Sequence, residues 1–207
     1  TKLRVTDTDA RDVIPYLPDL YDEPFADSSQ IPTHLVCRAA RQHVTVALSG
    51  DGGDELFGGY NRYIRGPGLW KRLSKVPKPI RQVSGHAAQV LPEKTWDMIG
   101  GAYNHLRHGS AGISGLGTKV HRLSERLRLT ENLDDLHRNM ASTWIEPEIV
   151  MAGNISEPPS QLDDPLPAFG ADDPAMRMMV QDMRSYLPDD ILCKVDRAAM
   201  GVSLETR

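Results

Sequence analysis

The chain has 207 residues, enough for one large domain or two small ones. Its hydrophobic content of 40% and charged content of 25% are ordinary for a soluble globular protein. A formal net charge of −4, without a cluster of basic residues, argues against a nucleic-acid binder. No apolar stretch approaches the roughly 18 residues of a membrane span. Cys37 and Cys193 lie far apart in the sequence. We therefore expect a cytoplasmic protein that binds neither nucleic acid nor membrane and has two free thiols.

The first third of the chain alternates between helix and strand. An early helix is expected over about 8–18, and another begins near Pro32, which suits the first turn, and runs to about Gln42. The β-branched segment Val44–Leu48 follows at once and is typical of a buried parallel strand. A loop then leads into a helix from about Asp54. This order of elements predicts a doubly wound α/β layer.

The rest of the chain has mainly helical patterns. Breaks at Gly and Pro separate the expected helices, which cover about 78–91, 94–107, 116–128, 131–140, 174–186 and 188–200. The stretch 157–174 is rich in Pro and Asp and predicts a surface loop. One convincing strand is too little for a complete Rossmann-like domain. We therefore predict a mainly α fold with a small parallel-sheet remnant, belonging to a longer protein.

The loop after the strand has the composition of a ligand site. Two carboxylates, Asp51 and Asp54, would repel a bare phosphate, but they could share a Mg²⁺ ion with a phosphate chain. Amides at the start of the next helix favour anions. Small residues leave the backbone open to close approach by a ligand; these are Ser49, Gly50, Gly52 and Gly53.

A structural interpretation of the same loop is simpler. Asp51 can be a turn residue and Asp54 a helix-start residue, each stabilising only the local backbone. Three features favour a ligand site instead: the apolar strand directly before the loop, the spacing of the carboxylates, and the pair Gly58-Gly59 where an ordinary helix avoids glycine.

A second candidate lies on an amphipathic helix near the end of the chain. Lys194 falls at the edge of its apolar stripe, where it could reach into a cleft. On periodicity alone, a lysine paired with Asp190 four residues earlier is the favoured interpretation. Arg197 is expected to be structural, bridging to nearby carboxylates. The apolar stripe consists of Ile191, Val195, Ala198 and Val202.

Two long segments together carry a family resemblance. Residues 48–60, LSGDGGDELFGGY, and residues 187–207, LPDDILCKVDRAAMGVSLETR, resemble the synthetase domain of glutamine-dependent asparagine synthetases of the B type. The short segments 22–24 and 31–33 are similar to the same family, whereas about 65–170 is weakly diagnostic. The resemblance implies part of an α/β domain of the adenine-nucleotide α-hydrolase-like (ATP pyrophosphatase) kind.

The resemblance implies an ATP-dependent, amide-forming ligase. Aspartate would attack ATP to give β-aspartyl-AMP and pyrophosphate, and ammonia from glutamine would displace AMP to give asparagine. By position, Asp54 would be a Mg²⁺ ligand at the pyrophosphate, and Lys194 would stabilise charge on the phosphoryl transition state and the leaving pyrophosphate. Asp51 stands where the family often has Glu, tied to the amide-forming step. The shorter Asp would have to reach further or act through water.

Two parts of the family pattern do not occur in these residues. The ATP-binding loop of the form Ser-Gly-Gly-x-Asp-Ser and the nucleophilic Cys of the glutaminase domain would both lie upstream of Thr1. We therefore expect residues 1–207 to form a partial synthetase domain that is inactive alone. The implied partners are aspartate, ATP, ammonia and the upstream glutaminase domain, and a homodimer is compatible with this pattern.

Other functions stay open from the sequence. Related amidotransferases close β-lactam rings or amidate polysaccharide precursors, and the acceptor pocket cannot be identified here. A non-catalytic module that docks through the helical region 66–140 is an alternative of a different class. A hydrolase with Asp51 and Asp54 as acid and base is a third, but Ser49 has no His in its loop to activate it.

Overall fold

The two ends of the chain form one compact unit and the middle forms another. A computed structural model of the protein describes residues 5–106, 115–142, 159–166 and 172–207. One unit consists of Thr1–Tyr60 and Glu146–Arg207, and the other of Asn61–Ile145. Both segments that indicated function therefore belong to the first unit. Within the described ranges, the helices are too short or too polar to cross a membrane.

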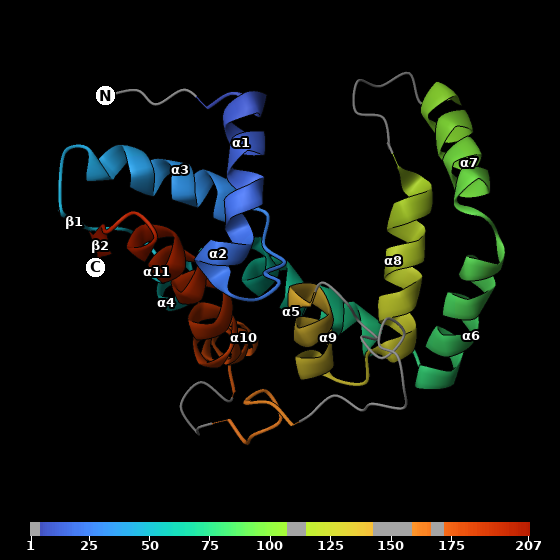
Figure 1. Cartoon of the computed structure of the whole chain (residues 1–207). Helices are drawn as coiled ribbons and strands as arrows, with labels where there is room; N and C mark the ends of the chain where they lie inside the picture. The colour runs from blue at the N-terminus through green and yellow to red at the C-terminus, as the bar shows by residue number, and fades with distance from the viewer. Residues whose placement is uncertain (1–4, 107–114, 143–158, 167–171) are drawn as a thin grey trace. The chain divides into compact units, whose positions relative to one another are not determined.

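Short helices make up most of the first unit (Figure 1). In chain order they are α1 (Asp7–Val13), η1 (Ile14–Tyr16), α2 (Leu17–Tyr21), α3 (Gln30–Arg41), α4 (Gly53–Phe57), α10 (Pro174–Arg184), η3 (Leu187–Leu192) and α11 (Cys193–Met200).

The helix expected over 8–18 is divided into three pieces. It begins with a capping box, in which the backbone N–H of Thr6 donates to Asp9 and that of Asp9 donates to the Thr6 hydroxyl. A 3₁₀ turn then separates α1 from α2. Pro15 and Pro18 fall in this stretch, and because proline has no N–H, neither can continue an α-helical ladder.

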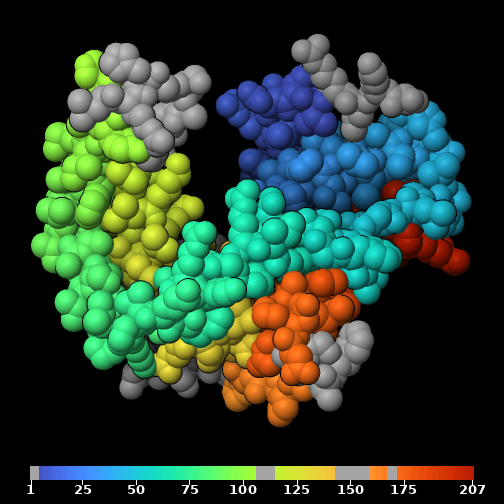
Figure 2. All heavy atoms as spheres, turned by 180° about the vertical axis from the view of Figure 1, so that it is seen from behind, coloured from blue at the N-terminus to red at the C-terminus, as the bar shows by residue number. Residues whose placement is uncertain are grey.

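The predicted parallel strand is present, but it is short and exposed. Strand β1 covers only Val46–Ala47 and pairs in parallel with β2, Glu205–Thr206, which the sequence did not predict. The prediction of a buried strand over Val44–Leu48 is wrong, because Val46 is 44% exposed and Leu48 is 87% exposed. Within the described residues β1 has one neighbouring strand, so only one of its sides is paired. In Figure 2 the red C-terminal residues lie at the surface beside the cyan segment that contains β1.

The core of the first unit lies between α3 and α11. Ala198 and Ala199 are fully buried and pack with Cys37 and Leu204. Ala47 of β1 packs against the same cluster. Small side chains at this contact let the helices and the strand approach closely, and this fixes the end of β1 against the lysine-bearing helix. Cys37 and Cys193 are free, as predicted.

The second unit is helical. Its helices are α5 (Asn61–Leu73), α6 (Lys78–Val90), α7 (Glu93–Leu106), α8 (Leu116–Leu129) and α9 (Leu133–Ala141). Within it, α8 packs against α6 and α7, and α9 packs against α5 (Figure 1). The last four were predicted within one or two residues. Helix α5 was missed, because its central Gly66-Pro67-Gly68 is a pattern that normally interrupts helices.

The fold is therefore mainly helical with a very small parallel sheet, as predicted. Of the predicted surface loop over 157–174, the structure describes 159–166 and 172–174. Residues 159–166 form turns and irregular backbone that is mostly exposed, as predicted, and α10 begins at Pro174. The helix predicted over 188–200 is instead two segments, the π-helical η3 and the α-helical α11. A π-helical turn inside a helix frequently marks a functional site.

Candidate functional site

The glycine-rich loop continues directly from the sheet. The backbone N–H of Ser49 donates to the carbonyl of Arg207 at 2.9 Å, which extends the strand pairing by one residue. A tight turn follows, in which the N–H of Gly53 donates to the carbonyl of Gly50 at 3.1 Å. Gly52 in this turn has φ +85°, a conformation that side-chain-bearing residues rarely adopt. The turn thus delivers the following residues to the end of the sheet.

Packing accounts for Gly52 but not for its neighbours. A β-carbon on Gly52 would lie 3.5 Å from Leu187, so the turn rests on the segment that begins the lysine helix. Apart from its adjoining backbone, a β-carbon on Gly50 or Gly53 would meet no atom of the described residues within 4 Å. The space beside these two backbone positions is open, and a ligand could approach the main chain there.

The glycine pair after α4 shapes the position of Asp54. Gly58, with φ +74°, ends the helix after Phe57. The N–H of Gly59 then donates to the Asp54 carbonyl at 2.9 Å, and a β-carbon on Gly59 would lie only 2.0 Å from Asp54 Oδ1. The carboxylate of Asp54 therefore lies against the Gly59 backbone while the residue stays exposed.

Asp51 lies at a cavity of about 340 Å³ at the ends of the two strands. Ser49, Thr33 and Thr206 are its other polar residues, and Val195 of α11 is among its apolar ones. Burial raises the pKa of the Cys37 thiol in the same wall, and the negative charge of Asp51 adds to this effect. The remaining lining residues are Pro32, Val36, Ala40, Ala47, Leu48 and Leu204.

The two sequence segments that indicated function are packed against each other. Gly52 lies against Leu187, and Asp51 and Val195 line one cavity. A β-carbon on Gly58 would lie 3.5 Å from the sulfur of Met179, and α4 packs against α10. Residues more than 120 positions apart in the sequence thus pack together within the first unit.

A buried acidic side chain ties α4 to this assembly. Glu55 is 1% exposed and accepts a hydrogen bond of 2.6 Å from the hydroxyl of Tyr60. Burial and this bond raise the pKa of Tyr60, so its hydroxyl keeps its proton. The ring of Tyr60 meets the ring of Tyr186 edge to face, with centroids 6.0 Å apart. Glu55 is thereby linked to the residue just before η3.

Lys194 is buried and its ammonium is held by Asp27. The residue is 8% exposed, and Nζ lies 2.6 Å from Asp27 Oδ2. The pairing with Asp190 favoured from periodicity is wrong, because the hydrogen bond is made to Asp27, which is 167 residues away in the sequence. The position of the loop before α3 decides this contact, and helical periodicity gives no information about that position.

The two carboxyls near Lys194, those of Asp27 and Asp190, have shifted pKa values. Burial opposes ionisation of Asp27, but hydrogen bonds from Lys194 and Ser29 outweigh it and hold the pKa of Asp27 below its ordinary value. Burial and the charge of Asp27 raise the pKa of Asp190, against the effects of Lys194 and Tyr186. The surroundings therefore favour the ionised form of Asp27 and disfavour that of Asp190.

Arg197 has the structural role predicted for it. Its guanidinium donates to the carboxylate of Asp22, on the loop that precedes α3. The side chains are 44% and 72% exposed, so water screens the pair and it contributes little stability.

Sequence reasoning missed Asp27, Glu55 and Tyr60. The segment Asp27-Ser28-Ser29 lies outside the segments that carry the family resemblance, although an aspartate followed by serines is a pattern that fixes a carboxylate through local hydrogen bonds. Glu55 follows Asp54 directly and appeared to be one more acidic residue at a helix start. Its burial depends on contacts with distant segments.

The donor set at the loop fits a magnesium ion shared with a phosphate chain. Groups of three or more His, Cys, Asp or Glu side chains able to hold a metal alone do not occur in the described part of the chain. Asp51 and Asp54 are exposed carboxylates, and such oxygen ligands supply one or two positions while substrate oxygens and water supply the others.

Comparisons with known proteins identify the family. A family model for asparagine synthase matches residues 1–207. A putative glutamine-hydrolysing asparagine synthetase of Mycobacterium tuberculosis strain H37Rv is 35% identical over 187 residues, covering 90% of this chain and 25% of the relative. Asparagine synthetase 1 of Bacillus subtilis strain 168 is 31% identical over 192 residues, covering 90% of this chain and 26% of the relative.

A shorter match falls on part of the chain. A putative asparagine synthetase 2 of Methanocaldococcus jannaschii is 52% identical over 64 residues, or 31% of this chain. No solved structure matches. The chain spans about a quarter of the length of the longer-matching relatives. With a family model that covers every residue, the chain belongs to the asparagine synthase family.

Proposed function

We propose that this chain is the magnesium and pyrophosphate side of an ATP-dependent amide-forming active site. The whole enzyme would activate aspartate as β-aspartyl-AMP and transfer ammonia from glutamine to give asparagine. One observation supports this most: the acidic loop and the lysine helix, far apart in sequence, pack together around Leu187. They bring carboxylates and a buried ammonium into one unit.

The open backbone supports phosphate binding at the loop. Ser49 and the glycines at 50, 52 and 53 would bind the nucleotide, because the main chain beside Gly50 and Gly53 is unobstructed. Asp54 would hold the magnesium ion, with its carboxylate oriented by Gly59. The metal would neutralise phosphate charge.

Lys194 would stabilise negative charge on the phosphate chain. Its ammonium is shielded from water, and electrostatic interactions are stronger in such surroundings than in bulk solvent. Asp51 would serve the amide-forming step by accepting a hydrogen bond from the incoming ammonia, directly or through a water molecule. Its exposed position at the strand-end cavity gives it access to a small ligand.

The chain would be part of a larger synthetase domain. We propose an α/β domain of the adenine-nucleotide α-hydrolase-like kind, with residues 1–207 as one portion of it. The parallel pairing of β1 with β2 supports this, because parallel strands are typical of such layered folds. The length of the relatives supports a whole protein that also contains an ATP-binding loop and a glutaminase domain.

Which carboxylic acid accepts the ammonia is a separate question from how the amide bond is formed. Aspartate is proposed because the relatives are named as asparagine synthetases. Related amidotransferases with other carboxylate acceptors would use the same phosphate side. Initial rates of the intact enzyme with aspartate, compared with other carboxylic acids, decide between them: a faster reaction with another acid would exclude aspartate as the acceptor.

Two substitutions in the intact enzyme test the proposed roles. Asp54→Asn and Lys194→Ala should each lower pyrophosphate release by about 100-fold or more, since each removes charge stabilisation at the phosphates. Asp12→Asn and Lys75→Ala are matched controls on exposed residues and should keep the parental rate. Glutaminase activity should survive in all four. Unchanged turnover in both site variants would support the non-catalytic interaction module instead.

A further inference from the structure

We propose that Asp27 is the positioning residue that holds the Lys194 ammonium in place for the phosphate chain. The proposal rests on the role given to Lys194 above and adds a residue that neither motif contains. Asp27 would not touch the substrate. It would act through Lys194, by keeping a buried lysine charged and by fixing where its N–H groups point.

The hydrogen bonds around Asp27 leave its carboxylate little freedom. Oδ1 accepts the backbone N–H of Ser29 at 2.8 Å, and Oδ2 accepts the Ser29 hydroxyl at 2.6 Å. Lys194 Nζ donates to the same Oδ2 at 2.6 Å. A carboxylate with both oxygens bonded is fixed in orientation, so the ammonium that it binds is fixed as well.

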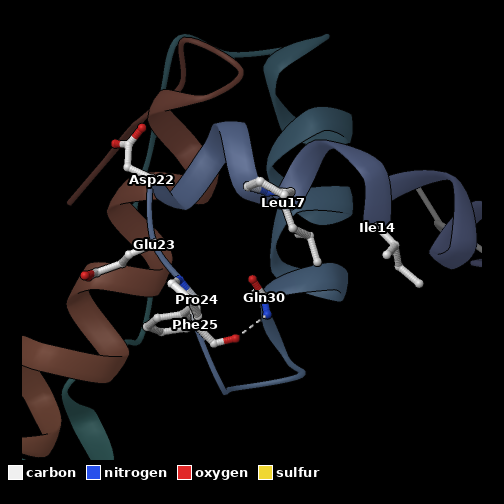
Figure 3. Close-up of a pocket in the computed structure, with 8 residues that line it drawn as sticks. Ile14, Leu17, Asp22, Glu23, Pro24, Phe25 and Gln30 are labelled. Atoms are coloured by element: carbon white, nitrogen blue, oxygen red, sulfur yellow. Dashed lines mark hydrogen bonds between the residues drawn. The ribbon is translucent and has the colours of Figure 1, made fainter. Parts of the chain in front are cut away.

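The loop that carries Asp27 is itself anchored to the lysine helix. Gln30 reaches back from α3 and donates from Nε2 to the carbonyl of Phe25 at 3.0 Å (Figure 3). The Phe25 ring stacks on Tyr21 at a centroid distance of 4.9 Å. The Tyr21 hydroxyl donates to the backbone carbonyl of Lys194 at 3.2 Å. Both the backbone and the side chain of Lys194 are therefore bound to the segment 21–29.

The ammonium keeps hydrogen-bonding capacity for a substrate. A lysine ammonium has three N–H donors. Among the described residues, Lys194 uses one of them for its hydrogen bond to Asp27. Two donors are then available for phosphate oxygens. The side chain of Lys194 is 10% exposed and that of Asp27 is 23% exposed, so the pair is shielded but a ligand can reach it.

Substitution of Asp27 in the intact enzyme tests this role. Asp27→Asn should lower kcat for pyrophosphate release about tenfold or more, with a smaller change in KM for aspartate, because the loss falls on transition-state charge. Asp27→Glu should recover part of the rate. Asp22→Asn is the matched control, since it removes an exposed ion pair from the same loop, and it should stay within about twofold of the parent.

A double variant shows whether Asp27 acts through Lys194. Asp27→Asn should cause no further loss in an enzyme that already carries Lys194→Ala. Additive losses, or a parental kcat in folded Asp27→Asn, would overturn the positioning role. If Lys194→Ala alone keeps full turnover, the proposed function of Lys194 fails, and this outcome is distinct from a failure of Asp27 alone.

A milder substitution covers the case in which Asp27→Asn does not fold, judged by circular dichroism. Ser29→Ala removes one bond to Asp27 Oδ2 and keeps the ion pair, so kcat should fall roughly threefold, the value of one hydrogen bond. Ser28→Ala is the control, because Ser28 is exposed and beside it. Equal kcat values for the two variants would overturn the proposal.

Discussion

Glu55 and Tyr60 are bonded inside the protein directly beside the exposed carboxylate of Asp54. The Tyr60 hydroxyl donates to Glu55 Oε1 at 2.6 Å, and Glu55 is 1% exposed. Neighbouring acidic residues in one short helix thus have opposite environments, with Asp54 outside and Glu55 inside. The buried Glu55 anchors α4, so the exposed Asp54 is available to bind a ligand.

Loss of the Tyr60 hydroxyl should destabilise the first unit. Tyr60→Phe leaves a buried carboxylate without this donor, which we expect to lower the free energy of unfolding by about 1–3 kcal/mol. Urea denaturation of the chain followed by circular dichroism measures this. Tyr16→Phe is the control, since Tyr16 is 63% exposed and should be neutral. Equal midpoints for the two variants would contradict the role of the Glu55–Tyr60 bond.

The sequence predicted the helices and the strand more accurately than it predicted tertiary contacts. Helical spacing predicted α6 to α9 closely, because an apolar stripe with Gly or Pro at its ends depends only on nearby residues. The apolar run Val44–Leu48 predicted a strand, and the parallel direction was correct. Its burial was not, because burial depends on what packs over the strand, and Leu48 is 87% exposed.

The partner of Lys194 shows the same limit at the site. Helical periodicity offers only neighbours three or four positions away, so Asp190 was the natural candidate. The actual partner, Asp27, comes from a loop 167 residues earlier. The motif residues stand out in the sequence by their spacing and family pattern. The residues that support them could not, because tertiary packing brings them together.

Gly59 should be required for the position of Asp54. In Gly59→Ala the new β-carbon would meet Asp54 Oδ1 at 2.0 Å and Asp54 Cα at 3.2 Å, so the flexible carboxylate must rotate away. We expect turnover of the intact enzyme to fall by about tenfold or more through loss of charge stabilisation, with a stability cost of only about 1–2 kcal/mol.

Pyrophosphate release and thermal unfolding of the same preparations separate these two effects. Gly101→Ala is the control, because Gly101 lies in the helix α7 and a β-carbon there meets no atom of the described residues within 4 Å, apart from the backbone of its own helix. It should keep the parental rate and should be slightly more stable. A Gly59→Ala enzyme with parental turnover would show that the orientation of Asp54 does not depend on this glycine.

The Asp27–Lys194 pair should make stability depend on acid pH. The pKa of Asp27 is lowered in the folded state, so its contribution is fully present above the unfolded-state value of about 4 and is lost as the pH falls through the folded-state value. Removing one partner of a buried pair costs about 3 kcal/mol. Asp27→Asn should therefore be less stable than the parent at pH 7, and this difference should shrink below about pH 4.

Urea denaturation at pH 7, 5 and 3 measures this dependence. Asp22→Asn, which removes an exposed pair, should follow the parent at each pH. A difference between Asp27→Asn and the parent that stays constant from pH 7 to pH 3 would mean that the loss comes from packing and not from the charge of Asp27.

Residues 1–207 alone should not form product. They supply the acidic loop and Lys194, but the Ser-Gly-Gly-x-Asp-Ser pattern expected to bind ATP does not occur among them. Without that loop the nucleotide is not oriented, and orientation accounts for a large part of the rate. Pyrophosphate release should therefore stay at background when the chain is given ATP, Mg²⁺, aspartate and ammonium. The intact enzyme is the positive control, and circular dichroism confirms that the isolated chain is folded. Turnover by the folded chain that Lys194→Ala abolishes would show that these residues contain a complete active site.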